Sequence, residues 1–286
     1  MRVGVPRGLA LAALLAVAAV RTTTRRADEG QPRAGEALAT PAPWAPPGGP
    51  AAAPDDGPPY DGRFTFVRIR WEAGGGGQGL RGFGRYGRGR GGGEALWEHD
   101  MRRGAERHFA KILDEMTFVG PSLEGRVLTF DDPELFRYPV SYIVEVGYWR
   151  PTEAEVEGLR AYLLKGGFLI VDDFRGWGAL ANFEEQMQRV LPGTRLLQVE
   201  ARHPIFDSFF HIPDPLSMIP AYGDEPPVYL GIFEDNDVEG RLMAIVNYNN
   251  DLGEYWEFSD VGYYPIDLSN EAYKFGVNYV VYAMTH

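Results

Sequence analysis

Cysteine is absent from the 286 residues of this sequence. Its absence excludes thiol nucleophiles, disulfide bonds, thiolate metal ligands and lipid attachment to an N-terminal cysteine. The five histidines show neither His-x-His nor His-Glu-x-x-His spacing, which argues against a zinc site. No serine stands in a Gly-x-Ser-x-Gly elbow either. The sequence therefore carries none of these catalytic signatures, and we expect no cofactor.

The apolar run near the N-terminus, residues 8–20, is shorter than the ~20 residues that a membrane-spanning helix needs. Arg2 and Arg7 precede it, and Ala16-Val17-Ala18 offers a small-x-small cleavage pattern. This arrangement is typical of a signal peptide. We expect residues 1–20 to direct export to the periplasm or beyond, and the alternative is a short N-terminal membrane anchor. Residues 21–62, rich in proline and alanine, predict a disordered tether.

Negative charge dominates the chain, with a net charge of −12, but it is spread unevenly. Residues 108–286 hold 12 lysines and arginines against 29 acids, whereas residues 74–93 form a glycine- and arginine-rich stretch. Such stretches can stack on single-stranded nucleic acid. An acidic body repels phosphates, however, so we favour an expanded loop and predict no nucleic-acid partner.

Strand and helix patterns alternate from residue 63 to residue 286, which predicts a single α/β domain with a mostly parallel sheet. A C-terminal hairpin and helix follow, and Thr152 with Glu155 predicts a capping box. The expected strands are Phe64–Trp71, Arg126–Phe130, Val140–Val146, Phe168–Val171 and Leu196–Val199, and the hairpin pairs Val228–Phe233 with Arg241–Asn247. The expected helices are 100–116, one after Thr152, one over 180–190, and one from a Ser269 cap through Met284.

The most informative stretch is 165–174, where two glycines end a helix and the apolar run Phe168–Val171 follows. A short apolar run without alternation is typical of a strand that is covered on both faces. Asp172 and Asp173 come directly after it. Ligands of open α/β sheets collect at the carboxyl ends of the strands, so these two aspartates mark the place to look for a site.

Several motifs in order carry a resemblance to a known family. They are Phe64–Arg70, Asp131–Pro139, Gly166–Phe174, His203–Phe206, Asn247–Gly253 and Tyr282–His286. The chain resembles the bacterial family known only as domain of unknown function 4159. This resemblance implies a three-layer flavodoxin-like fold, similar to the class I glutamine amidotransferase superfamily, and no established activity. Amidotransferase chemistry by a cysteine mechanism is excluded, because there is no cysteine.

Carboxylates gather at the predicted strand ends. Asp131, Asp132, Glu145, Asp172 and Asp173 could bind a hard cation or share acid and base roles. The structural alternatives are a helix cap for Asp132, which precedes a proline, and caps or ion pairs with Arg70 or Arg175 for Asp172 and Asp173. The sequence leaves both interpretations open, and we predict no metal site from it.

Polar and aromatic residues farther along the chain complete the candidates. His203 follows the fifth strand and could approach the same strand ends, although a structural histidine in a turn is the alternative. Asn249, Asp251 and Trp256 could form a sugar-binding surface or simply turns. The candidate ligand-binding residues are Arg70, Asp131, Asp172, Asp173, His203, Asn249, Asp251 and Trp256.

Two functions fit this pattern. The first is a non-enzymatic domain of the cell envelope that binds a partner protein or a small ligand at the strand ends, favoured by the lack of a catalytic set. The second is a hydrolase acting on a carbohydrate or related substrate through Asp172, Asp173 and His203. We expect membrane contact only through the N-terminal signal.

Overall fold

The computed structural model describes residues 57–72, 96–100 and 104–286. The predicted signal peptide, most of the predicted tether and the glycine- and arginine-rich stretch lie outside the described residues. Within the described ranges, no helix combines the length and the apolar character that crossing a bilayer requires.

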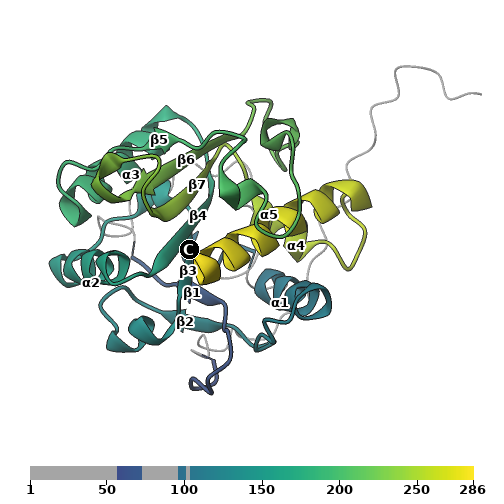
Figure 1. Cartoon of the computed structure of the whole chain (residues 1–286), viewed down its shortest axis with the longest axis horizontal. Coiled ribbons are helices and arrows are strands. Elements are labelled where there is room, and N and C mark those ends of the chain that lie inside the picture. The colour runs from purple at the N-terminus through teal and green to yellow at the C-terminus, as the bar shows by residue number, and fades with distance from the viewer. Residues whose placement is uncertain (1–56, 73–95, 101–103) are drawn as a thin grey trace, which may run out of the picture. The chain divides into compact units, whose positions relative to one another are not determined.

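A seven-stranded sheet lies at the centre of the described domain, in the order β2-β1-β3-β4-β7-β6-β5 (Figure 1). All its neighbouring strands are parallel except β6, which runs antiparallel to both β5 and β7. The strands are β1 (Val67–Ile69), β2 (Arg126–Leu128), β3 (Val140–Val144), β4 (Phe168–Phe174), β5 (Leu197–Gln198), β6 (Val228–Phe233) and β7 (Leu242–Tyr248). The mostly parallel sheet with its hairpin confirms the predicted α/β class.

Helices cover both faces of the sheet, which makes three layers (Figure 1). They are α1 (Ala105–Met116), α2 (Glu153–Leu164), α3 (Trp177–Val190), α4 (Leu252–Glu257) and α5 (Ile266–Thr285). The alternation along β4 shows the two cores: Phe168 and Ile170 pack with residues of α1, α4 and α5, whereas Leu169 and Val171 pack with residues of α2 and α3. The strand is therefore covered on both faces, as its apolar run predicts.

The ends of the helices confirm one predicted cap and correct another. Thr152 and Glu155 form the predicted capping box, in which Thr152 Oγ1 accepts from Glu155 N at 3.2 Å and Thr152 N donates to Glu155 Oε2 at 2.8 Å. The predicted Ser269 cap is wrong, because Ser269 lies buried inside α5. Pro265 precedes that helix with a φ of −52°, which suits a helix start, so the helix begins at Ile266, earlier in the chain than predicted.

Strand β4 extends past its apolar run and includes both aspartates that were expected to follow it. Val144 pairs with Asp172, and Phe174 pairs with Tyr248 across an irregular register. The irregularity coincides with Asp173, whose φ is +49°. The carboxyl end of β4 is therefore a buried and distorted piece of strand rather than an open loop.

Candidate metal centre

Three segments bring ionisable side chains together at the carboxyl end of the parallel strands. His99 and Asp100 precede α1, Asp173 is the penultimate residue of β4, and Asp251 precedes α4. One ligating atom from each of these four side chains lies within 4.8 Å of the others. Two atoms bound to the same ion at about 2.0–2.4 Å lie at most about 4.8 Å apart, and the four side chains meet this condition for sharing one cation.

A buried arginine on β1 holds the segment that carries His99. The Arg68 guanidinium pairs with Glu106 of α1, and it also donates to the carbonyl oxygens of Trp97 at 3.2 Å and His99 at 2.8 Å. Arg68 is 1% exposed, so these bonds are shielded from competing water. This anchor fixes the backbone on which the histidine and the following aspartate stand.

The backbone around the cluster is strained. Four residues have φ between +49° and +65°, a region that residues other than glycine rarely occupy: Asp100, Glu145, Asp173 and Asn249. The strained residues meet at β4, because Glu145 N donates to Asp173 O at 3.1 Å and Asn249 N donates to Phe174 O at 3.0 Å. Strain of this kind collects at functional sites, where the surrounding structure enforces it.

Each of the four side chains has a buried polar atom whose hydrogen-bonding contacts, among the described residues, lie within the cluster. His99 Nδ1 lies 2.7 Å from Asp173 Oδ2 and 3.2 Å from Asp100 Oδ1. Apart from these contacts with His99, neither oxygen of Asp100, nor Oδ2 of Asp173, nor Oδ2 of Asp251 accepts a hydrogen bond from the described residues. The three aspartates are at most 3% exposed. Buried oxygens are almost always bonded in folded proteins, so this set fits a positively charged ligand.

Electrostatics at the cluster favours a cation as well. Burial raises the pKa of Asp100 to about 7. Burial and the charges of Asp100 and Asp173 raise the pKa of Asp251 well above its ordinary value. Burial opposes ionisation of Asp173 too, but His99 and Arg175 outweigh it and lower its pKa. A divalent cation would let all three carboxylates ionise together.

Asp172, a predicted ligand residue, instead has a structural role, because both of its carboxylate oxygens accept hydrogen bonds from the protein. Its Oδ2 accepts from the Tyr142 hydroxyl at 2.8 Å and from the backbone N–H groups of Leu252 at 2.9 Å and Gly253 at 3.1 Å. Its Oδ1 accepts from Asn247 Nδ2 at 3.1 Å. Asp172 therefore ties the start of α4 to β4 and thereby positions the residue just before that helix, Asp251.

Other predicted residues lie beside the cluster or away from it. Asn249 stands at its edge, where its Oδ1 accepts from Gly176 N at 3.3 Å. Arg70 follows β1, and its backbone N–H donates to Leu128 O at 2.8 Å. Asp131 is exposed and accepts from a neighbouring threonine. Asp132 is the predicted cap, since its Oδ1 accepts from the N–H two residues on, at 2.8 Å.

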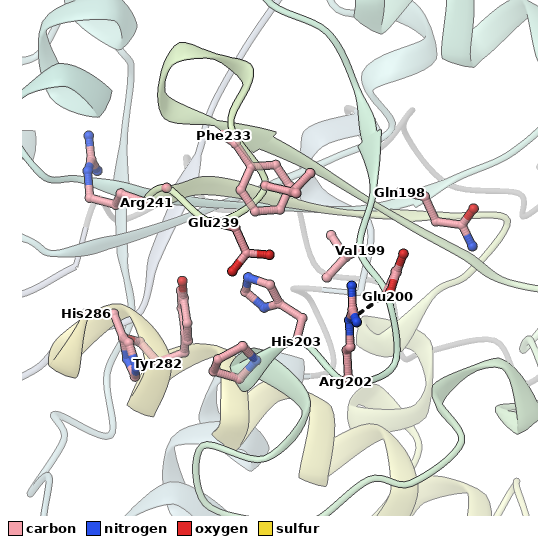
Figure 2. A pocket seen from close by; sticks show the side chains of 13 residues that line it. Gln198, Val199, Glu200, Arg202, His203, Phe233, Glu239, Arg241, Tyr282 and His286 are labelled. Atoms are coloured by element: carbon pink, nitrogen blue, oxygen red, sulfur yellow. Dashed lines mark hydrogen bonds and ion pairs between the residues drawn. The ribbon is translucent and has the colours of Figure 1, made fainter.

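The expectation that His203 approaches the strand-end carboxylates is wrong. Its ring packs against Phe233 and Tyr282, with centroid distances of 5.7 and 5.5 Å, in a cavity of about 660 Å³ (Figure 2). Phe233 pairs with Leu242 at the start of β7, so this cavity lies at the opposite end of the sheet from Asp173. Burial and then His286 lower the pKa of His203 to about 4. His203 is a packed, neutral residue near neutral pH.

The alternative of an exposed aromatic surface around Trp256 is also wrong. Residues 252–257 form α4, which was not predicted, and this helix turns Trp256 into the core, where it is 1% exposed. The indole stacks on Phe109 of α1 with centroids 4.6 Å apart. Tyr255 beside it is equally buried. No open platform for a sugar exists at these two positions.

Sequence reasoning missed His99, Asp100 and Glu254. The first two stand in Glu98-His99-Asp100, shortly after the glycine- and arginine-rich stretch 74–93. A signal was nevertheless present, because the loop after the first strand of an α/β unit opens at the carboxyl end of the sheet. His99 and Asp100, at the end of that loop, could therefore have been proposed as site residues on the same ground as Asp173.

A comparison with known protein families gives a match. A family model described as "Domain of unknown function (DUF4159)" matches residues 85–284, which include all four side chains of the candidate centre. None of the curated proteins compared with the chain matches it. The description of the family names no activity, so a function has to be argued from the site.

Proposed function

The chain belongs to the family of domain of unknown function 4159, and from its candidate metal centre we propose that the domain binds a divalent cation. The ligands are His99, Asp100, Asp173 and Asp251. One observation carries the proposal: the four side chains that lie close enough together to share an ion each have a buried polar atom with no hydrogen-bond partner among the described residues outside this cluster. Carboxylates so placed repel each other, and a bound divalent cation would relieve that repulsion.

The donor set indicates which ion fits. Carboxylate oxygens suit magnesium, calcium and manganese, whereas imidazole suits zinc, iron and other transition metals. One imidazole nitrogen with three carboxylates therefore favours Mn²⁺, which accepts both donor types, with Zn²⁺ and Fe²⁺ next. A site for Ca²⁺ would use oxygen ligands only.

Calorimetric titration of EDTA-treated protein with Mn²⁺ tests the proposal. We expect saturable binding, and we expect Asp100→Asn, which keeps the shape of the side chain but removes its charge, to weaken binding at least tenfold. Loss of even an outer partner of a metal ligand typically costs 10–100-fold in affinity. Asp131→Asn is the matched control, because it removes one exposed carboxylate elsewhere. Absence of binding, or equal losses in both variants, would refute the proposal.

We propose further that the domain acts outside the cytoplasm, where the ion would bind a small ligand or a site on another envelope protein. The N-terminal sequence supports this location through its charged start, short apolar core and Ala-x-Ala exit. Cell fractionation followed by N-terminal sequencing tests it. We expect a mature N-terminus near Ala19, and a cytoplasmic protein with an intact Met1 would contradict the location.

A hydrolase is the second candidate, and Glu145 is the observation that favours it. Glu145 has a strained backbone, and burial together with the charge of Asp173 raises its pKa to about 8. It therefore holds a proton at neutral pH beside an ion that could polarise water, as a general acid requires. Release of reducing sugar from polysaccharides in the presence of Mn²⁺, abolished by EDTA and by Glu145→Gln, would support it. Equal release by the Glu145→Gln variant would count against it.

A further inference from the structure

Asp100 has a second carboxylate oxygen that the single ion does not account for. Among the described residues, Oδ2 has no hydrogen-bond partner and Oδ1 has only the contact with His99, although Asp100 is only 3% exposed. Oδ1 lies 3.2 Å from His99 Nδ1, on the side of the cluster described above. Oδ2 lies against α4, since a Cβ atom at Gly253 would be 2.5 Å from it. Oδ1 therefore faces His99, whereas Oδ2 faces α4.

Helix α4 presents two further carboxylates to Asp100. Glu254 and Glu257 are three residues apart, so they project from the same side of the helix, and one ligating atom of each lies within 4.8 Å of Asp100 and of the other. Glu254 is 4% exposed, and its Oε1 accepts from the Tyr264 hydroxyl at 2.8 Å. That bond orients the carboxylate and leaves it lone pairs for another partner.

We propose that a second divalent cation binds between Asp100, Glu254 and Glu257, so that Asp100 bridges two ions. This proposal rests on the first ion proposed above. Paired ions that share a carboxylate lie about 3.5–4 Å apart in proteins and together hold an oxygen atom of a ligand. The domain would then take ligands with an anionic oxygen group, such as a carboxylate or a phosphate. The glycine at 253 lets α4 approach Asp100 closely enough to share it.

Metal stoichiometry and electron paramagnetic resonance of the full chain test the second site with Mn²⁺ as the probe. After EDTA treatment and saturation with Mn²⁺, we expect two ions per chain and the multiline spectrum of a spin-coupled pair. The double variant Glu254→Gln/Glu257→Gln should bind one ion and show the spectrum of isolated Mn²⁺. Glu184→Gln/Glu185→Gln, which removes two exposed carboxylates from α3, is the matched control and should retain the coupled pair.

The outcomes separate the two proposals. A single ion per chain in the unaltered protein would overturn the bridged pair and leave the first site standing. Two ions without spin coupling would also overturn it, because the second ion would then lie elsewhere. No bound ion would overturn both. Should the double variant lose its far-ultraviolet circular dichroism, the stoichiometry and coupling of the unaltered protein still decide the question.

Discussion

A cation that binds the folded state but not the unfolded state should stabilise the domain by an amount that follows from mass action. At an Mn²⁺ concentration 100 times the dissociation constant, the free energy of unfolding rises by about 2.7 kcal/mol. The described domain spans residues 57–286, a size at which 1 kcal/mol shifts the melting temperature by about 2–4 °C. We therefore expect Mn²⁺ to raise the melting temperature by about 5–11 °C.

Asp251→Asn separates this effect from general salt effects. Oδ1 of Asp251 accepts from Glu254 N at 2.8 Å and caps α4, a bond that an asparagine oxygen also makes. Oδ2, which accepts no hydrogen bond from the described residues, is lost as a proposed ligand, and with it a buried charge that the other carboxylates disfavour. The variant should melt at the same or a higher temperature without metal, and Mn²⁺ should shift it by less than about 2 °C.

Differential scanning fluorimetry in EDTA and in Mn²⁺, with NaCl matching the ionic strength, measures both shifts. A variant that responds to Mn²⁺ as fully as the unaltered protein would show that Asp251 is no ligand. A marked loss of stability without metal would show that its carboxylate is held by the fold, and the electrostatic reasoning would fail.

Three further predictions concern the neighbourhood of the cluster. Asp172→Asn should cost about 1–3 kcal/mol in urea unfolding, because an amide group replaces an acceptor of backbone N–H groups; an unchanged midpoint would refute its structural role. Asp100 and Glu145 have pKa values of about 7 and 8 in the folded state and about 4 when unfolded, so the folded state binds more protons between these values. Stability of the metal-free protein should therefore fall as the pH rises from 5 to 8.5, by about 1.4 kcal/mol per unit for each proton held, and a melting temperature that rises with pH would contradict this. Gly253→Ala should weaken Mn²⁺ binding more than tenfold, because the added Cβ meets Asp100 Oδ2 at 2.5 Å; calorimetry showing unchanged affinity would contradict that contact.

Local patterns predicted the elements well, because their causes are local. The Phe168–Val171 run, the Thr152 capping box and the Asp132 cap each depend on residues within a few positions of one another. The position of His203 was predicted wrongly because it depends on contacts that are distant in the sequence. β5 has only two residues, and after it the chain folds back, so that the His203 ring packs at the far end of the sheet. No property of the residues near His203 records that reversal.

The candidate site was only partly predictable, because its members come from loops far apart in the chain. His99 reaches Asp173 across 74 positions, and it is held there by Arg68, a third distant residue. The burial of Trp256 could not be predicted, because a six-residue helix, α4, has too few turns to show a periodic pattern. The partners of a loop depend on the order of the strands, which single-sequence patterns do not contain.

The adjacent aspartates show what strand geometry adds. Successive side chains of a strand point to opposite faces, so Asp172 and Asp173 were never equivalent candidates for a single site. Asp172 faces α4 and receives hydrogen bonds from it, whereas the positive φ of Asp173 turns its carboxylate towards His99. Asp172 therefore holds α4 in place, and Asp173 is the proposed ligand of the two. Replacing both at once would combine a loss of stability with a loss of binding, and only single variants can assign the two functions.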